Sequence, residues 1–186
     1  MTEQFSIRPA QFDDAEAIAQ VQVAAWGTTY VGMVPDALIE RMTVPDRTQS
    51  WQRILRQLAE TGRGAVFVCC RGVRVVGFAS VGPQREAELL AAGYDGELTS
   101  LYLLGDVQRR GLGRSLVGLC ASEALELGYQ KLSVWVLSAN VNARRFYEAL
   151  GARLLIERES EDRFDPVDEV AYGWDAPQTL DSGPCD

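Results

Sequence analysis

Residues 108–115 read Gln-Arg-Arg-Gly-Leu-Gly-Arg-Ser and lie between an apolar segment and a run of apolar residues at helical spacing. Backbone N–H groups at a helix N-terminus point outward, glycines let an anion approach the backbone, and arginines add positive charge. The stretch lacks the lysine of one common nucleotide loop and the third glycine of the other. It therefore predicts a phosphate-binding loop of another kind, the alternative being a glycine-containing turn before a surface helix.

Strand and helix patterns alternate on both sides of this stretch. Before it, we expect a strand at 5–8, a helix from Asp13, helices at 35–42 and 46–59, a hairpin of 65–71 and 73–82, a connector at 83–93, and a strand at 96–104. After it, we expect a helix at 110–127, a strand at 131–137, a helix at 140–150, and strands near 152–159 and 169–174. This order predicts an α/β fold with a mixed sheet covered by helices.

Length and composition indicate one domain, which we place at residues 1–175, followed by a polar tail at 176–186 that is expected to be disordered. No apolar run is long enough to cross a bilayer, and the first residues lack a secretory leader pattern, so a cytoplasmic location is expected. The four cysteines lack zinc-site spacing and are expected to be reduced core residues; no metal is predicted. The formal charge of −8 argues against nucleic-acid binding.

Two motifs resemble the Gcn5-related N-acetyltransferase (GNAT) family. Gln108, Gly111 and Gly113 match the acetyl-CoA signature Q/R-x-x-G-x-G/A, and residues 140–152, NVNARRFYEALGA, resemble the family's N-x-x-A-x-x-F-Y-x-x-x-G-F segment. Ala152 stands where an aromatic residue is commoner. The resemblance implies a sheet in which two neighbouring parallel strands, here 97–104 and 131–137, splay apart to admit the pantetheine arm of acetyl-CoA, the co-substrate.

The resemblance also implies which residues hold acetyl-CoA. Backbone groups of the central strand would bind the thioester end and the pantetheine amides, and the amides of 109–115 would bind the pyrophosphate. The expected cofactor-binding residues are Leu101, Tyr102, Leu103, Gln108, Arg109, Arg110, Gly111, Leu112, Gly113, Arg114, Ser115 and Asn140. Asn140 is also expected to cap the helix that it begins.

The chain contains no histidine, so a general base for amine attack must be a carboxylate, a backbone group or a water chain. Glu97 is the expected base, because it begins the strand that leads into the loop and strand alternation places residues 97, 99, 101 and 103 on one face; the resemblance implies that it acts through water. The resemblance places it where several family members carry a catalytic glutamate. Tyr147, on the same helix face as Asn140 and Arg144, is the expected general acid.

The acceptor is expected to be a small-molecule amine or a peptide or protein N-terminus, and Trp26 and Tyr30 are expected to line its pocket. A homodimer is a further expectation from the resemblance. A rival function is a catalytically silent acyl-CoA-binding sensor, against which the presence of Glu97 and Tyr147 argues.

Overall fold

The computed structural model describes residues 4–160 and 167–180, which form a seven-stranded sheet. The sheet order is β1-β2-β3-β4-β5-β7-β6, and every neighbouring pair is antiparallel except β4–β5. The strands are β1 (Phe5–Pro9), β2 (Ala65–Arg71), β3 (Arg74–Pro83), β4 (Gly96–Leu103), β5 (Leu132–Leu137), β6 (Arg153–Arg158) and β7 (Glu169–Trp174). The mixed sheet expected from the order of elements is therefore present, with one parallel pair near its centre.

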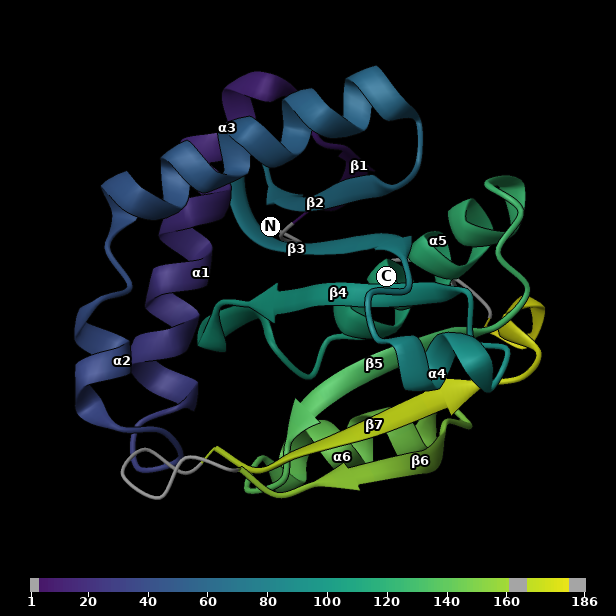
Figure 1. Cartoon of the computed structure of the whole chain (residues 1–186). Coiled ribbons are helices and arrows are strands. Elements are labelled where there is room, and N and C mark those ends of the chain that lie inside the picture. Colours follow the sequence, from purple (N-terminus) through teal and green to yellow (C-terminus); the bar gives the residue numbers. More distant parts are fainter. Residues whose placement is uncertain (1–3, 161–166, 181–186) are drawn as a thin grey trace.

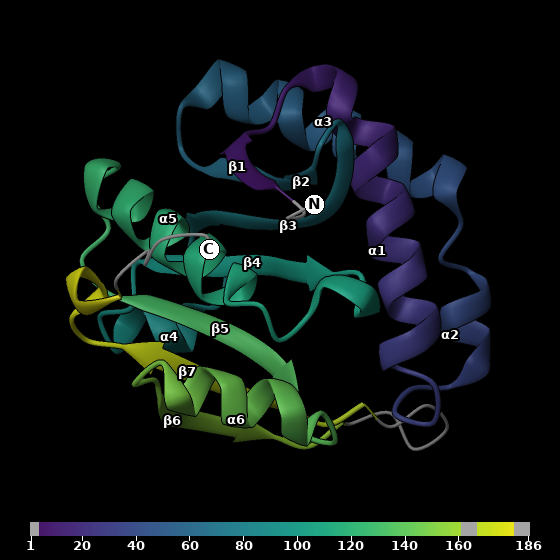
Figure 2. The same ribbon diagram turned by 180° about the vertical axis from the view of Figure 1, so that it is seen from behind.

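The described residues form six α-helices. They are α1 (Ala15–Thr29), α2 (Asp36–Glu40), α3 (Val44–Thr61), α4 (Ala87–Ala91), α5 (Leu112–Glu126) and α6 (Val141–Ala149). Five of them cover the two faces of the sheet, while α2 lies beside α1 away from the sheet (Figures 1 and 2). Local signals set their ends: Thr43 accepts from the Asp46 amide at the start of α3, and Gly62, with φ 61°, ends it. Helices α1, α3 and α4 lie on one face, and α5 and α6 lie on the other (Figure 2).

The hydrophobic core is divided by the sheet. Leu112, Leu116 and Cys120 of α5 pack against the face that carries Leu98 and Val134, whereas Ile18 of α1 packs with a second cluster on the opposite face. The cysteines at 69, 70 and 120 are buried and not disulfide-bonded, as expected. Cys185 lies outside the described residues.

Strand β4 contains a bulge that changes which side chains share a face. Ser80 of β3 pairs with Ser100, but the next residue, Val81, pairs with Leu98, so Thr99 is an extra residue in β4. Consequently Leu101 packs on the α5 side with Leu98, while Glu97 faces the side of α1 and α3. The expectation that Glu97 and Leu101 share one face is therefore wrong, because simple alternation does not pass through a bulge.

The C-terminal segment also differs from the expectation of a disordered tail starting at Ala176. Residues Pro177–Thr179 form a 3-10 helix, and Pro177 and Leu180 are buried. Leu180 packs in the same core cluster as α5. Residues 181–186 lie outside the described residues.

Candidate functional site

The parallel strands β4 and β5 pair only at their beginnings. Gly96 pairs with Leu132 and Glu97 with Ser133, and no further pair follows within the described residues. The Leu104 amide donates to Val76 of β3, so alternation directs the backbone groups of Leu103 and Leu101 away from β3 and toward β5. Apart from the Leu103 carbonyl, which accepts from Gln108, these backbone groups have no pair in β5 and can bind an extended, amide-containing ligand; the pantetheine arm of acetyl-CoA has that chemistry.

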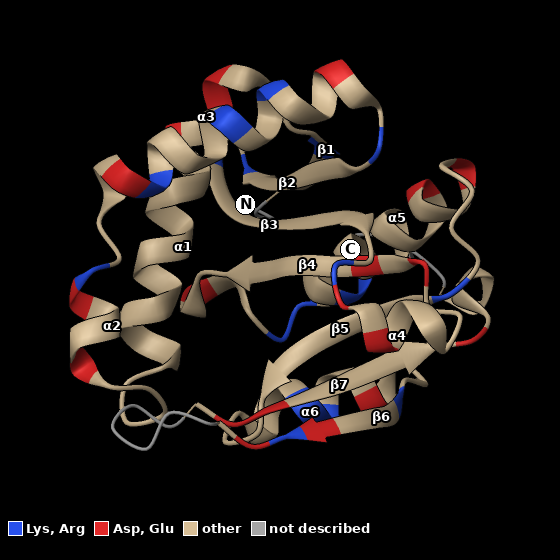
Figure 3. Ribbon diagram, viewed as in Figure 1, with Lys and Arg blue, Asp and Glu red and all other residues tan. Residues whose placement is uncertain are grey.

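The loop between β4 and α5 has a backbone suited to an anion. Arg109 has φ 62° and Gly111 has φ 80°, and Gly111 is the N-cap of α5. The Ser115 amide makes a helical bond to the Gly111 carbonyl, so it is not available to an anion, whereas the preceding amides lie in the first turn. Figure 3 shows the basic residues of this loop beside the end of β4. The left-handed residues and the helix start together fit a pyrophosphate.

Two predicted cofactor-binding side chains shape the backbone of this region. Gln108 donates from Nε2 to the Leu103 carbonyl at 3.0 Å, which ties the loop to the end of β4. Asn140 is buried and caps α6 by accepting from the Ala143 amide at 3.1 Å, as expected. Other contacts also position the loop: the Arg110 guanidinium lies 5.6 Å from the centre of the Phe5 ring.

Glu97 lies at the point where β4 and β5 diverge, and its side chain is 2% exposed. Arg85, in the segment between β3 and α4, donates from Nε to one carboxylate oxygen at 3.0 Å and from Nη2 to the other. The hydrogen bond to Glu97 is the main cause of the raised pKa of Arg85. Both oxygens of the expected base are thus already hydrogen-bonded, which leaves their remaining lone pairs for a proton or a water.

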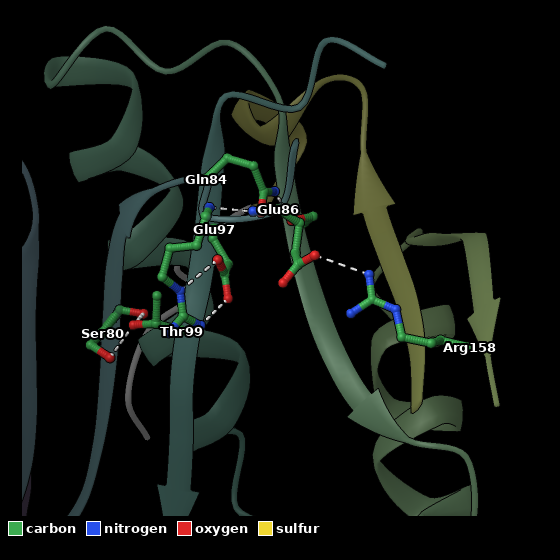
Figure 4. Close-up of polar contacts among 8 residues, drawn as sticks. Ser80, Gln84, Glu86, Glu97, Thr99 and Arg158 are labelled. Carbon is green, nitrogen blue, oxygen red and sulfur yellow. Dashed lines mark hydrogen bonds and ion pairs between the residues drawn. The ribbon is translucent and has the colours of Figure 1, made fainter. Parts of the chain in front are cut away.

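Two more carboxylates lie near Glu97 on the same face. Glu86 accepts from Arg158 at 3.0 Å, and Figure 4 shows Glu86 between Glu97 and Arg158. Burial raises the pKa of Glu169, at the start of β7, and the charges of Glu86 and Glu97 raise it further, while Arg158 opposes the shift. The face beside the diverging strands is therefore acidic, with arginines as partial counter-charges.

Tyr147 of α6 is buried in the core on the α5 side, where its ring packs edge-on against Phe146 and Trp174. It is more buried than Phe146, its neighbour on α6. Burial, followed by the charges of Tyr102 and Cys120, raises the pKa of Tyr147 above its usual range. Within the described part of the chain its hydroxyl makes no hydrogen bond, and the raised pKa keeps it protonated at neutral pH.

Trp26 and Tyr30, the residues expected to line an acceptor pocket, lie together at the end of α1. Their ring centres are 4.8 Å apart, and Trp26 Nε1 donates to the Tyr102 hydroxyl at 3.1 Å. Burial raises the pKa of Tyr30, and Tyr102, Tyr147 and Glu169 add to the shift. The structure thus brings Tyr30, Tyr102 and Tyr147 close to one another. Tyr30 and Tyr102 lie on the α1 side of β4, and Tyr147 lies on the α5 side.

Several residues of this region are not identified by the sequence. Arg85 and Glu86 belong to a segment that reads only as a polar connector, and Glu169 reads as an ordinary strand start. Gln22 and Arg47 have polar side chains on helices and give no motif. The one usable signal is Gln84-Arg85-Glu86, a polar run directly after an apolar strand, where functional side chains often lie.

Among residues 4–160 and 167–180, no three histidine, cysteine, aspartate or glutamate side chains are grouped as metal ligands would be. Across the same residues, no helix combines the length and the apolar character needed to cross a bilayer.

Comparison with known proteins supports the same assignment. Residues 23–152 match the family described as "Acetyltransferase (GNAT) family". An uncharacterized N-acetyltransferase of Bacillus subtilis, YuaI, is 34% identical over 176 residues, which cover 91% of this chain and 92% of that protein.

Solved structures share the fold at lower identity. The PaiA N-acetyltransferase of Thermoplasma acidophilum, crystallised with coenzyme A, has a TM-score of 0.68 at 18% identity over 89% of this chain and 98% of its own. The putative acetyltransferase YncA of Salmonella typhimurium, with acetyl-CoA, has a TM-score of 0.68 at 22% identity over 98% of both chains. The chain therefore belongs to the acetyltransferase (GNAT) family, whose members take the acetyl group from acetyl-CoA.

Proposed function

We propose that the protein transfers an acetyl group from acetyl-CoA to a primary amine by direct attack within a ternary complex. The observation that carries the proposal is the divergence of β4 and β5 after Glu97 and Ser133, next to the anion-suited start of α5. The residues that would hold acetyl-CoA are the backbone of Leu101 and Leu103 and the first-turn amides of α5.

An alkyl amine is mostly protonated at neutral pH, so the reaction needs a group that removes a proton. We assign this role to Glu97, acting through a water molecule. Its position at the divergence of the strands and its burial support the assignment. Arg85 holds the carboxylate in one orientation, which favours a fixed water position over a mobile side chain.

Glu169 is a second candidate for the same role. Its pKa is raised by burial and by the charges of Glu86 and Glu97, which makes it a stronger proton acceptor than an ordinary glutamate. Its carboxylate influences Tyr30, one of the expected pocket residues. Comparing Glu97→Gln with Glu169→Gln separates the two assignments.

We assign the general acid to Tyr147, which would protonate the departing thiolate. A raised pKa keeps the hydroxyl protonated throughout the neutral range, and no described residue competes for its proton. The core packing of the ring against Trp174 fixes its orientation. These features suit a donor whose position does not change during the reaction.

The acceptor is a small-molecule amine or a peptide or protein N-terminus, and we place Trp26 and Tyr30 in its pocket. Similar proteins carry names of both kinds: the L-ornithine N5-acetyltransferase NATA1 of Arabidopsis thaliana is 28% identical over 102 residues, and a ribosomal-protein-alanine N-acetyltransferase of Brucella melitensis shares the fold with a TM-score of 0.70. A homodimer remains a prediction; β1 and β6 are the edge strands of the described sheet through which it would pair.

The test is calorimetric titration with acetyl-CoA, followed by a thiol-release assay over a panel of amines, amino acids and N-terminal peptides. Binding with release on at least one acceptor is expected. Binding without release on any acceptor would favour the catalytically silent sensor, and an absence of binding would contradict the proposal altogether.

A further inference from the structure

A cavity of about 360 Å³ lies between α1, α3 and the face of β3 and β4 that carries Glu97. This size falls in the range of pockets that hold small molecules. Its polar lining comes from the side chains Gln22, Arg47, Ser80, Arg85, Thr99 and Ser100, and no lining residue is acidic. Although the chain has a formal charge of −8, the cavity is lined by two arginines and by no carboxylate, which favours an anionic ligand.

Gln22 gives the strongest evidence that the cavity is a built site. The residue is 7% exposed, and its Oε1 accepts from Arg47 Nε at 3.0 Å and from Trp51 Nε1 at 2.8 Å. These two donors fix the orientation of the amide, because only its oxygen can accept. The amide nitrogen of Gln22 then has no hydrogen-bond partner among the described residues, and Gln22 is one of the residues that line the cavity.

The two arginines that line the cavity provide further N–H donors. Arg47 uses Nε for Gln22, and none of the described carboxylates forms an ion pair with it. Arg85 uses Nε and Nη2 for Glu97, which leaves Nη1 without a described partner. Guanidinium groups with free N–H donors, together with an amide N–H and hydroxyls, match the acceptor oxygens of a carboxylate.

Glu97 lies between the cavity, which is lined by Arg47 and Arg85, and the carboxylate of Glu86. Ser80 and Thr99, which line the cavity, lie on one side of Glu97 in Figure 4, and Glu86 lies on the other. A ligand that carries a carboxylate and an amine within a few bonds can place the carboxylate toward Arg47 and Arg85 and the amine toward the carboxylates.

We propose that the acceptor is a free amino acid whose carboxylate binds in this cavity at Arg47, Arg85 and Gln22. The inference rests on the proposed acetyl transfer and names the class of its acceptor. Arg85 lines the cavity and is hydrogen-bonded to Glu97. Binding of the amino acid's carboxylate and the position of the proposed base, Glu97, are therefore linked through one side chain.

The experiment compares acceptors that differ only in the carboxylate: L-alanine with L-alaninamide and ethylamine, and L-phenylalanine with phenethylamine. In the thiol-release assay, kcat/KM for the better amino acid is expected to exceed that of its analogues without a carboxylate about ten- to hundredfold, the value of one charge-assisted hydrogen-bond pair. Arg47→Gln should remove this preference, mainly through KM, and Arg47→Lys should retain part of it because the charge remains. Arg53→Gln, an exposed arginine on the same helix, should leave it unchanged.

Equal kcat/KM for amino acids and their analogues, or a preference that survives in Arg47→Gln, would overturn the inference while leaving acetyl transfer intact. Calorimetric titration of the amino acids into protein saturated with coenzyme A decides the inference even if no acetylation is found. Binding that is lost in Arg47→Gln supports it, and the absence of binding overturns it. Inorganic phosphate that binds more tightly than any amino acid would also overturn it and identify a separate anion site.

Discussion

Arg85 holds the carboxylate of Glu97 in a two-point hydrogen-bonded pair, although the Arg85 side chain is 68% exposed and that of Glu97 is 2% exposed. A buried carboxylate is costly unless it is paired, so Arg85 satisfies the charge that the proposed base brings into the protein. Because the guanidinium reaches in from the surface, the pair can be rearranged by a ligand without unfolding the sheet. The chemistry at Glu97 is therefore tied to what Arg85 contacts.

Replacing Glu97 by Gln is expected to lower kcat at least about a hundredfold, since general base catalysis is worth that much or more. The amide keeps the size of the side chain, and the acetyl-CoA contacts are proposed to come from the backbone, so coenzyme affinity should stay within about twofold of wild type. Single-turnover thiol release and calorimetry measure the two quantities. If Glu97→Gln is fully active and Glu169→Gln is not, the base is Glu169.

Tyr147→Phe is expected to lower kcat while leaving the fold and acetyl-CoA affinity nearly unchanged, because only a hydroxyl without a described partner is removed. Since the pKa of Tyr147 is raised, its deprotonation should not limit the rate below about pH 10, the usual pKa of tyrosine. The wild-type rate should therefore rise with pH as the acceptor amine loses its proton, with no fall before that pH. Tyr129→Phe is the control, since its hydroxyl donates to the Arg63 carbonyl and has no role in the proposed reaction. A decline of the wild-type rate between pH 8 and 9 would argue against Tyr147 as the acid.

The sequence predicts the sheet, the helices and the loop at 108–115 because each rests on a local pattern: apolar periodicity, glycine and helix capping. It does not predict on which face of the sheet the Glu97 side chain lies, because the bulge at Thr99 arises from pairing with β3. The contact between Ser80 and Thr99 joins residues that are 19 positions apart in the sequence. It also misses Arg85, whose importance comes only from the buried carboxylate that it contacts. Residues whose roles depend on a distant partner carry no local signal.

Arg109 adopts a left-handed backbone conformation, with φ 62°, that is strained for any residue with a Cβ atom. Glycine at this position should therefore give a higher free energy of unfolding than alanine, by about 1 kcal/mol. Both substitutions remove the guanidinium, so both should weaken acetyl-CoA binding to a similar extent. Denaturant unfolding and calorimetry on Arg109→Gly and Arg109→Ala make the comparison. An alanine variant as stable as the glycine variant would show that the loop relaxes without cost.

Asp175 follows β7 and joins it to neighbouring elements, since it accepts from Arg153 Nε and Lys131 Nζ at 2.8 Å each and from the Tyr94 hydroxyl at 3.0 Å. The hydrogen bonds from Arg153 and Lys131 lower the pKa of Asp175 below its usual value. A carboxylate with a lowered folded-state pKa stabilises the fold above its unfolded pKa, near 3.9, and loses that contribution as the pH falls further.

Asp175→Asn should therefore lower the Tm at pH 7, and the difference from wild type should shrink as the pH is taken from about 4 toward 2. Added salt should also reduce the difference at pH 7, because these groups are exposed. Thermal unfolding followed by circular dichroism measures both trends, with Glu60→Gln, an exposed carboxylate at the end of α3, as the control. A difference that is the same at pH 7 and pH 3 would mean that the Asp175 side chain acts through its shape rather than its charge.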